Sequence, residues 1–307
     1  MTTPCAQGRR NGTGVVNPGA TAGTVGAVYE CFDVSISDGV AHVQLSRPDE
    51  LNTMVPSFWS ELPAIISDLD AGARARAIVL SSTGKHFSAG MDLSVFTGDN
   101  SLASGGGATE QGRRASFLWM MVQHLQDSFT ALERARMPVL AAVQGGCIGG
   151  AVDMVSAADM RYCTSDAFFC IQEINIGMTA DVGTLQRLLK IIPEGIAREL
   201  AYTGDRMPAA RAKEVGLVNE VFEDHGSLVE GTLEIAARIA AHSPLAIWGT
   251  KEAINYTRDH SVADSLRHIA GWQSGMFVGG DMMEEFAAKA EGRSASFEEI
   301  PSRPEHP

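Results

Sequence analysis

Apolar and polar positions alternate over residues 40–46, a period that is typical of a half-buried strand. Residues 77–82 and 139–143 are short apolar runs of the kind found in strands buried on both faces. Strands and helices that alternate along the chain predict an α/β domain with parallel pairing. The other elements expected here are helices over 56–69, 117–135 (capped by Ser116) and 182–191, and strands over 160–163 and 168–171.

The pattern changes after Pro193, where helical periodicity replaces the short strands. We therefore predict a disordered tail over 1–26, an α/β core over 27–194 and a helical region over 195–307. Within the core, the glycine-rich stretch 98–114 predicts a mobile surface loop. The helices expected in the last region cover residues 195–202, 208–215, 226–241, 244–257, 262–275 and 282–290.

Composition argues against several classes of protein. The chain has 307 residues, is 45% hydrophobic and carries a formal net charge of −13 without a long basic run, so nucleic-acid binding is not expected. The longest uncharged stretch, 137–152, is too short and too rich in glycine to span a membrane. Five scattered cysteines predict free thiols, and neither a disulfide framework nor a metal site. No targeting segment is recognised, so we expect a cytoplasmic protein.

Three acids, Asp153, Glu173 and Asp181, lie inside one apolar, glycine-rich stretch, 139–189. Acidic side chains are seldom buried without a partner or a task. A carboxylate in a dry pocket has a raised pKa and can exchange protons near neutral pH. Proton transfer is therefore the leading hypothesis for the chemistry of this chain.

Each acid also has a purely structural interpretation. Asp181 directly precedes an expected helix and could cap its N-terminus, which spacing alone favours. Asp153 could pair with Arg161 in the core, and Glu173, at the end of a strand, could face solvent. Under these interpretations the three acids need not lie in one site.

A glycine elbow, residues 145–150, joins a buried strand to the segment that carries Asp153. Its order, Gly-Gly-x-x-Gly-Gly, does not match the Gly-x-Gly-x-x-Gly of dinucleotide-binding folds, and the glycines could serve only close packing. Anion binding is a third interpretation, because N–H groups at the start of a helix can donate to an oxyanion. A second glycine turn, 85–92, would supply a second donor; its His86 and Ser88 lack the context of a hydrolase nucleophile.

Several motifs along the chain have the residues and spacing of one family. They are Arg47-Pro48 with Leu51-Asn52, the run from Phe87 to Leu93, the block 143–159, the run from Gly183 to Leu188, Ala210 with Glu214 and Gly216-Leu217-Val218-Asn219, and the run from Lys251 to Asn255. Through them the chain resembles the crotonase (enoyl-CoA hydratase/isomerase) superfamily over roughly residues 29–297. The resemblance implies an α/β spiral of ββα units with a C-terminal α-helical trimerisation region. It also implies an acyl-CoA thioester substrate and a homotrimer or dimer of trimers.

By this resemblance, the N–H groups of Met91 and Gly150 form an oxyanion hole. Ordinary hydratases of the family carry Glu at position 153 and Gly at 181, whereas a branch that converts 3,5-dienoyl-CoA into 2,4-dienoyl-CoA carries all three acids. In that chemistry Glu173 takes a proton from C2, Asp181 delivers one to C6, and Asp153 tunes Glu173. The resemblance assigns substrate binding to Ser88, Ala89, Gly90, Asp92, Leu93, Gly149 and Ala151.

The resemblance thus implies an isomerase of fatty-acid β-oxidation, and two other functions stay open. In an enoyl-CoA hydratase or mono-ene isomerase, Glu173 would act with Asp153 and Asp181 would be a cap. The third alternative is a non-catalytic CoA-binding scaffold, against which the retention of all three acids argues. Two departures from the family are Ala151, where the isomerases carry Gly, and Ser294, where related hydratases place a basic residue near the CoA phosphates.

Overall fold

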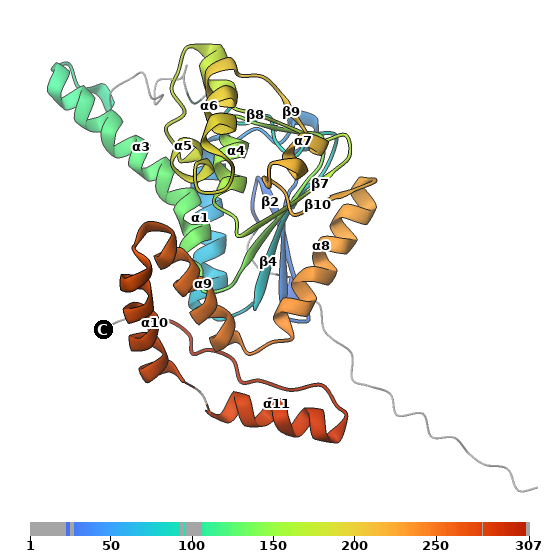
Figure 1. Ribbon diagram of the computed structural model, residues 1–307. Coiled ribbons are helices and arrows are strands. Elements are labelled where there is room, and N and C mark those ends of the chain that lie inside the picture. The colour runs from blue at the N-terminus through green and yellow to red at the C-terminus, as the bar shows by residue number, and fades with distance from the viewer. Residues whose placement is uncertain (1–22, 25–27, 93–94, 96–105, 278, 305–307) are drawn as a thin grey trace, which may run out of the picture.

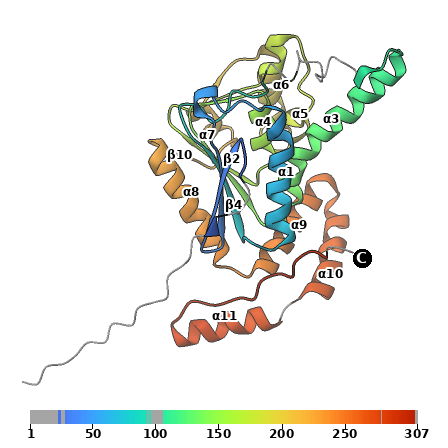
Figure 2. The same cartoon turned by 180° about the vertical axis from the view of Figure 1, so that it is seen from behind.

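A seven-stranded sheet forms the centre of the molecule, with helices on both of its faces (Figures 1 and 2). The computed structural model describes residues 23–24, 28–92, 95, 106–277 and 279–304. The large sheet has the order β1-β2-β3-β4-β5-β7-β10, parallel from β3 to β10 and antiparallel at β1 and β2. Its strands are β1 (Gly23–Thr24), β2 (Phe32–Ser37), β3 (Val40–Leu45), β4 (Ala77–Ser82), β5 (Val139–Val143), β7 (Met160–Thr164) and β10 (Glu220–Phe222).

A second, three-stranded sheet consists of β6 (Gly146–Ile148), β8 (Phe168–Cys170) and β9 (Met207–Pro208). The chain passes from β5 to β6 and into helix α4 (Gly150–Ser156), and then from β7 to β8 and into the 3-10 helix η3 (Gln172–Ile176). Each passage visits the large sheet, then the small sheet, then a helix. The expected succession of ββα units is therefore confirmed.

The remaining helices cover the two faces of the large sheet and extend beyond it. In chain order they are η1 (Pro48–Glu50), α1 (Pro56–Ala71), α3 (Gln111–Arg134), α5 (Thr184–Leu188), α6 (Glu194–Thr203), α7 (Ala209–Glu214), α8 (His225–Ala240), α9 (Pro244–Asp259), α10 (Val262–Met276) and α11 (Gly279–Glu291). Helix α8 packs on one face with Val79, Leu140 and Tyr162, while α1 and α3 enclose the larger apolar core on the other. None of the helices in the described ranges is long and apolar enough to cross a bilayer.

Several expected boundaries were wrong, each for a local reason. Helix α3 begins at Gln111 and not after Ser116, because the Glu110 carboxylate accepts hydrogen bonds from the N–H groups of Gly112 (2.7 Å) and Arg113 (2.9 Å). The loop expected over 98–114 therefore ends before residue 111, and residues 98–105 lie outside the described part. The helix expected over 182–191 is only Thr184–Leu188.

Two further expectations concern the ends of the sheet. Most of the tail expected over 1–26 lies outside the described residues, but Gly23 and Thr24 form β1 and pair with β2. The last third was expected to be nearly all helical, yet β10 adds a parallel edge strand beside β7, with Val221 opposite Cys163. The helical region thus contributes directly to the α/β core.

A buried lysine fastens α9 to the core. The Lys251 side chain is 5% exposed and its Nζ lies 2.8 Å from Asp159 Oδ2. The same ammonium donates to the carbonyl oxygen of Leu132 (2.9 Å), in the last turn of α3, and to that of Met137 (3.0 Å), just after the helix. Three oxygens thus surround one buried charge, and this arrangement ties the C-terminal helices to the sheet.

We expect Lys251→Met to lower the free energy of unfolding by about 3 kcal/mol, because it leaves the Asp159 carboxylate without its positive partner and two buried carbonyls without their donor. Urea unfolding followed by circular dichroism measures the change. The control is Lys213→Met: Lys213 also contacts an acid, Glu220, and a carbonyl, but it is 43% exposed, so its loss should cost less than about 1 kcal/mol. Equal losses in the two variants would contradict the role given to Lys251.

Candidate active site

Two backbone turns meet at the edge of the small sheet. Gly90 has φ +85°, and a Cβ built on it would lie 2.5 Å from the carbonyl oxygen of Ile148 and 3.4 Å from the nitrogen of Gly150. A side chain at position 90 would therefore collide with the backbone of the other turn. Only glycine allows the turn 85–92 to touch the elbow 145–150 in this way.

Hydrogen bonds hold the two turns in register. The N–H of Ser88 donates to Gly146 O, and the N–H of Ile148 donates to Ser88 O, both at 3.2 Å. The N–H of Gly146 donates to Nδ1 of His86 at 2.8 Å, and burial lowers the pKa of His86, which favours the neutral ring that this bond requires. The Ser88 hydroxyl donates to Asn52 O at 2.8 Å. Both side chains support the turns, and the hydrolase interpretation has no geometric basis.

The N–H groups of Met91 and Gly150 are available at this junction. The nitrogen of Met91 lies 3.9 Å from the position of a Cβ built on Gly150. Around Met91, the neighbouring groups are engaged with Met54, whose N–H donates to Gly90 O (2.9 Å) and whose carbonyl accepts from Asp92 N (3.2 Å). Within the described residues, neither Met91 nor Gly150 donates its N–H to another group of the chain. Two donors on adjacent turns form an arrangement suited to an anionic oxygen.

Glu173 lies next to these donors. It belongs to η3 and is half-buried, so the expectation that it ends a strand and faces solvent was wrong. A Cβ built on Gly149 would lie 3.2 Å from Glu173 Oε1, which places the carboxylate against the elbow. Its Oε2 is buried without a hydrogen-bond partner in the described part of the chain. Burial first, and then the charges of Asp153 and Asp181, raise the pKa of Glu173 to about 7.

Asp153 is buried in α4, with a relative exposure of 1%. The interpretation that pairs it with Arg161 was wrong, because the Arg161 guanidinium donates to backbone carbonyls such as Leu217 O (2.8 Å) and Ala158 O (2.7 Å). Asp153 Oδ1 instead accepts from the N–H of Thr184 at 2.5 Å. Burial raises the pKa of Asp153 to about 6, although the bonds from Thr184 and the charge of Arg187 oppose this rise.

Asp181 lies in the segment between η3 and α5. It is not the N-cap of α5, because the helix begins at Thr184 after Gly183 and has no side-chain cap, so the capping interpretation was wrong. Gln126 of α3 donates its side-chain amide to the Asp181 carbonyl at 2.7 Å. Burial raises the pKa of Asp181 as well. The charges of Asp153 and Asp181 both raise the pKa of Glu173, so the fold holds the three acids close enough for their charges to interact.

The residues assigned to substrate binding surround the same junction. Ser88 and Ala151 are fully buried, and Asp92 Oδ2 accepts from the hydroxyl of Thr53 at 3.1 Å. Leu93 lies outside the described residues. The others, whose backbone borders the junction, are Ala89, Gly90 and Gly149.

Sequence reasoning missed two supports of the site. Asn52 is 2% exposed and its amide donates to the carbonyls of Thr83 (2.8 Å) and His86 (3.1 Å), so it braces the turn 85–92 from inside. The Thr184 N–H is the donor that orients Asp153. Asn52 was recognised only as part of a motif, and no local pattern links position 184 to position 153. Among the described residues, no three His, Cys, Asp or Glu side chains are grouped as a metal site would require, and four buried cysteines are free.

Comparison with known proteins gives a consistent result. The family model described as enoyl-CoA hydratase/isomerase matches residues 35–299. The mitochondrial Delta(3,5)-Delta(2,4)-dienoyl-CoA isomerase of Homo sapiens is 41% identical over 267 residues, 86% of this chain and 80% of that protein. The peroxisomal enzyme of the same name from Arabidopsis thaliana is 39% identical, over 88% of this chain and 97% of that protein. The crystal structure of an enoyl-CoA hydratase from Bacillus anthracis superposes with a TM-score of 0.77 at 26% identity, covering 88% of this chain and all of that one.

The α/β spiral and the paired backbone turns are thus those of a crotonase-type fold. This protein belongs to the enoyl-CoA hydratase/isomerase family. Its relatives at about 40% identity carry the name dienoyl-CoA isomerase.

We expect Glu173→Gln to make the protein more stable than the parent above pH 7, by about 2 kcal/mol. The folded chain keeps the Glu173 proton up to about pH 7, whereas an unfolded chain loses it near the ordinary value of 4.5. The folded state binds more protons in this window, so the parent loses stability as the pH rises through it, and the amide does not. Urea unfolding at several pH values measures the difference.

The difference should shrink towards zero near pH 4, where both states of the parent are protonated. The control, Glu199→Gln on the exposed face of α6, should change the unfolding free energy by less than about 0.5 kcal/mol at every pH. A Glu173→Gln effect that does not depend on pH would show that Glu173 is an ordinary ionised carboxylate.

Proposed function

We propose that this protein isomerises a 3,5-dienoyl-CoA to the 2,4-dienoyl-CoA in fatty-acid β-oxidation. One observation carries the proposal: the Glu173 carboxylate lies against the elbow that offers two undonated backbone N–H groups, and the charges of Asp153 and Asp181 act on it. The identity of about 40% to dienoyl-CoA isomerases supports the choice of reaction. Coenzyme A enters as part of the substrate, and no separate cofactor is required.

Glu173 takes the proton from C2 of the substrate. The electron pair of that C–H bond delocalises into a dienolate, whose negative charge resides largely on the thioester oxygen. The N–H groups of Met91 and Gly150 donate to this oxygen, and one such donor is typically worth about 100- to 1000-fold in rate. Because both donors are backbone groups on turns in contact, no side chain has to reorganise when the charge develops.

Asp181 delivers a proton to C6, which leaves double bonds at C2–C3 and C4–C5. C2 and C6 lie at opposite ends of the dienyl segment, so one short carboxylate does not serve both. Asp153 takes no proton from the substrate and tunes Glu173 by its charge, because like-charged neighbours raise at least one pKa. Contacts to the thioester come from the backbone around Ala89, Gly90 and Gly149, and the further contacts assigned to Ser88, Asp92, Leu93 and Ala151 stay predictions.

Purified protein supplied with a 3,5-dienoyl-CoA should produce an increase in ultraviolet absorbance as the conjugated 2,4-diene forms. A parallel assay with a 2-enoyl-CoA tests hydration. No absorbance increase with the dienoyl substrate, together with rapid hydration of the 2-enoyl one, would establish a hydratase and overturn the isomerase. Tight CoA-thioester binding with neither reaction would establish the scaffold.

We expect Asp181→Asn to lower kcat for dienoyl isomerisation by about 100- to 10,000-fold, because it removes the acid that protonates C6. Thermal unfolding should change little, since the Asp181 side chain does not cap α5. The matched control is Asp127→Asn, on the exposed face of α3, which should keep the parental kcat. An Asp181→Asn variant with full activity would remove Asp181 from the mechanism.

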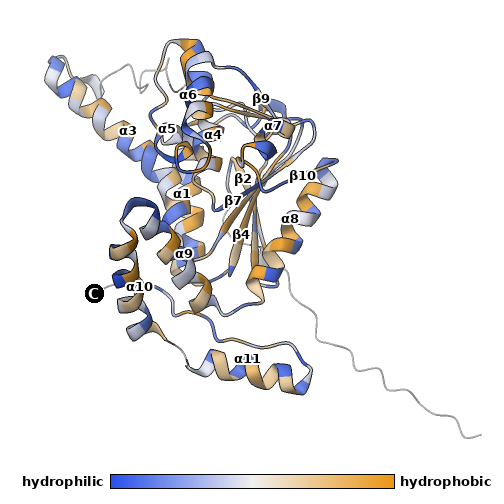
Figure 3. Ribbon diagram, viewed as in Figure 1, coloured by the Kyte–Doolittle hydropathy of each residue, from blue (hydrophilic) through white to orange (hydrophobic). Residues whose placement is uncertain are grey.

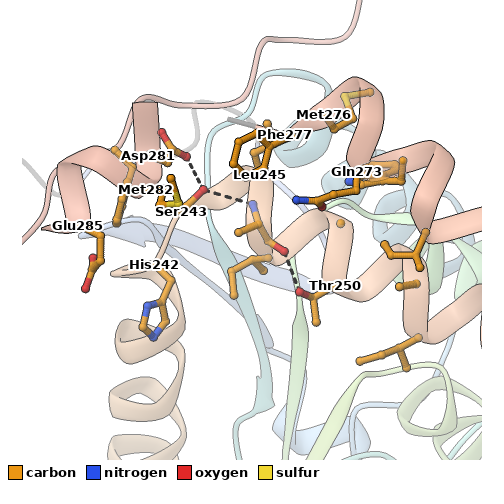
Figure 4. A pocket seen from close by; sticks show the side chains of 18 residues that line it. His242, Ser243, Leu245, Thr250, Gln273, Met276, Phe277, Asp281, Met282 and Glu285 are labelled. Carbon is orange, nitrogen blue, oxygen red and sulfur yellow. Dashed lines mark hydrogen bonds between the residues drawn. The ribbon is translucent and has the colours of Figure 1, made fainter. Parts of the chain in front are cut away.

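We also propose that the protein is a homotrimer or a dimer of trimers, assembled through its last helices. Helix α10 has no buried residue, and Leu266 is 64% and Met283 61% exposed. Figure 3 shows apolar residues along α10 and α11, which lie at one end of the molecule. A cavity of about 810 Å³ between α9, α10 and α11 is lined by Leu245, Met276, Phe277 and Met282 (Figure 4). Such apolar surface is typical of a subunit interface.

The double variant Leu266→Glu, Met283→Glu should therefore sediment as a monomer of 32.6 kDa, whereas the parent should have about three or six times that mass. Analytical ultracentrifugation gives the answer directly. Ala237→Glu, an exposed change on α8, is the control and should leave the parental mass unchanged. A monomeric parent would contradict the proposal.

The cytoplasmic location stays a prediction, since relatives bear the names of mitochondrial and peroxisomal proteins.

A further inference from the structure

Arg187, on α5, contacts the loop that follows Asp181 and is close enough to Asp153 for its charge to act on that carboxylate. Its Nη1 donates to the carbonyl oxygen of Val182 at 3.3 Å. Its Nη2 donates to the hydroxyl of Thr130 at 3.1 Å and to Glu133 Oε2 at 2.8 Å, both on α3. One guanidinium therefore joins the loop before α5 to the long helix beside it.

The backbone of Gly183 makes room for this guanidinium. Gly183 has φ +135°, a value that other residues rarely adopt, and a Cβ built there would lie 1.8 Å from Arg187 Nη1. A side chain at position 183 would displace Arg187 from the Val182 carbonyl. The glycine and the arginine are thus two parts of one arrangement.

Glu133 connects Arg187 to the C-terminal helices. Its Oε1 lies 2.9 Å from Arg258 Nη1 of α9, and the side chains of Glu133 and Arg187 are only 14% and 11% exposed. Asn255 of α9 donates to the Glu133 carbonyl at 3.2 Å. Lys190 donates to the Arg258 carbonyl at 3.2 Å and pairs with Asp259 at 3.5 Å. Helix α9 therefore braces the same network from the far side.

Successive residues of the loop from Asp181 to Thr184 are held by this surrounding framework. The Asp181 carbonyl accepts from Gln126, the Val182 carbonyl accepts from Arg187, and the Thr184 N–H donates to Asp153. Movement of this loop would displace Asp181 directly and would also disturb the Thr184 donor that orients Asp153. A displacement of about 1 Å can cost a reaction of this kind about 100-fold in rate.

We propose that Arg187 is a positioning residue, whose guanidinium, clamped by Glu133, fixes the loop 181–184 and thereby places the carboxylates of Asp153 and Asp181. It touches none of the reacting atoms. The kinetic part of this proposal rests on the proposed isomerisation.

The charges around the network allow a sharp test. Arg187 faces Asp153 from α5, and Glu133 on α3 offsets the positive charge of Arg187. This ion pair borders a polar cavity of about 310 Å³, which is also lined by Lys190, Arg258 and Asp259. Asp181, Glu173 and Cys147 face Asp153 from the other elements. Arg187→Gln removes a positive charge near Asp153, and Glu133→Gln removes a negative one. Both break the same ion pair, but their electrostatic effects on Asp153 are opposite.

We expect both variants to lower kcat by about tenfold or more, with less change in KM. The acidic limb of the pH profile of kcat/KM reports the coupled ionisation of Glu173, the base, and Asp153, whose charge acts on it. Its midpoint should rise in Arg187→Gln and fall in Glu133→Gln, each by about 0.5 to 1 pH unit. Arg187→Lys keeps the charge but not the three contacts, so it should restore the parental midpoint and recover only part of kcat. Shifts in the same direction, or none, would reduce the pair to a structural role and overturn the proposal.

A second measurement needs no substrate. Carbon-13 NMR of aspartate-labelled protein, with Asp153 assigned through Asp153→Asn, should show the Asp153 titration displaced in the same two directions. If the parent does not isomerise a dienoyl-CoA but the Asp153 titration shifts as expected, the proposed function fails and the electrostatic role of Arg187 stands. If Asp153 titrates as in the parent in both Arg187→Gln and Glu133→Gln, that role is overturned. Thr130→Val removes the hydroxyl that accepts from Arg187 and donates to the Gln126 carbonyl, but it keeps every charge near Asp153. Its midpoint should therefore stay parental, as should that of the surface control Arg211→Gln. If Arg187→Gln does not fold, Glu133→Gln and Arg187→Lys still decide the question.

Discussion

The contact between two backbone turns is the constraint on which the candidate site depends. The carbonyl of Ile148 occupies the space that a Cβ at Gly90 would need, so the backbones of the two turns are in direct contact. Strand pairing at Ser88 and Cys147 fixes their register, and Asn52 braces the first turn from the core. The donors at Met91 and Gly150 are consequently placed by the sheet itself. Backbone donors placed in this way need little reorganisation when a charge develops, which is where such sites gain most of their effect.

The three acids depend on the same packing for their chemistry. For each of them burial is the largest cause of the raised pKa, and for Glu173 and Asp153 the charges of neighbouring carboxylates add to the rise. Asp153 and Glu173 then differ in their hydrogen-bond partners. Asp153 accepts a short bond from Thr184, which favours its ionised form, whereas Glu173 Oε2 lacks a partner in the described part of the chain. Because coupled groups titrate together, the cluster as a whole holds an intermediate number of protons near neutral pH. A site that both takes and delivers protons near neutral pH needs acids that are only partly protonated.

Sequence patterns predicted the elements better than their ends. The apolar runs of β4 and β5 were found at their observed bounds, because strands buried on both faces leave an unmistakable pattern. Strand β2 was missed although Phe32, Val34 and Ile36 alternate with polar residues and the Asp38-Gly39 turn, with both φ positive, is a strong hairpin signal. Helix α3 was started too late because the capping carboxylate of Glu110 lies in a stretch dominated by glycine. Local pattern singled out the two glycine turns of the junction, and the resemblance to a family named Met91 and Gly150 as the donors. It could not reveal that Thr184 orients Asp153, since that bond joins residues 31 positions apart.

The C-terminal helices are more than an appendage to this core. Lys251 anchors α9 beside the end of α3, and Arg258 and Asn255, further along the same helix, reach Glu133. Helices α10 and α11, by contrast, present largely exposed apolar faces. One region therefore braces the loop 181–184 through Glu133 and Arg187 on its inner side and presents exposed apolar side chains on its outer side. Helix α9 belongs to both parts, because Arg258 and Asn255 reach Glu133, the partner of Arg187, while the same helix packs against α10.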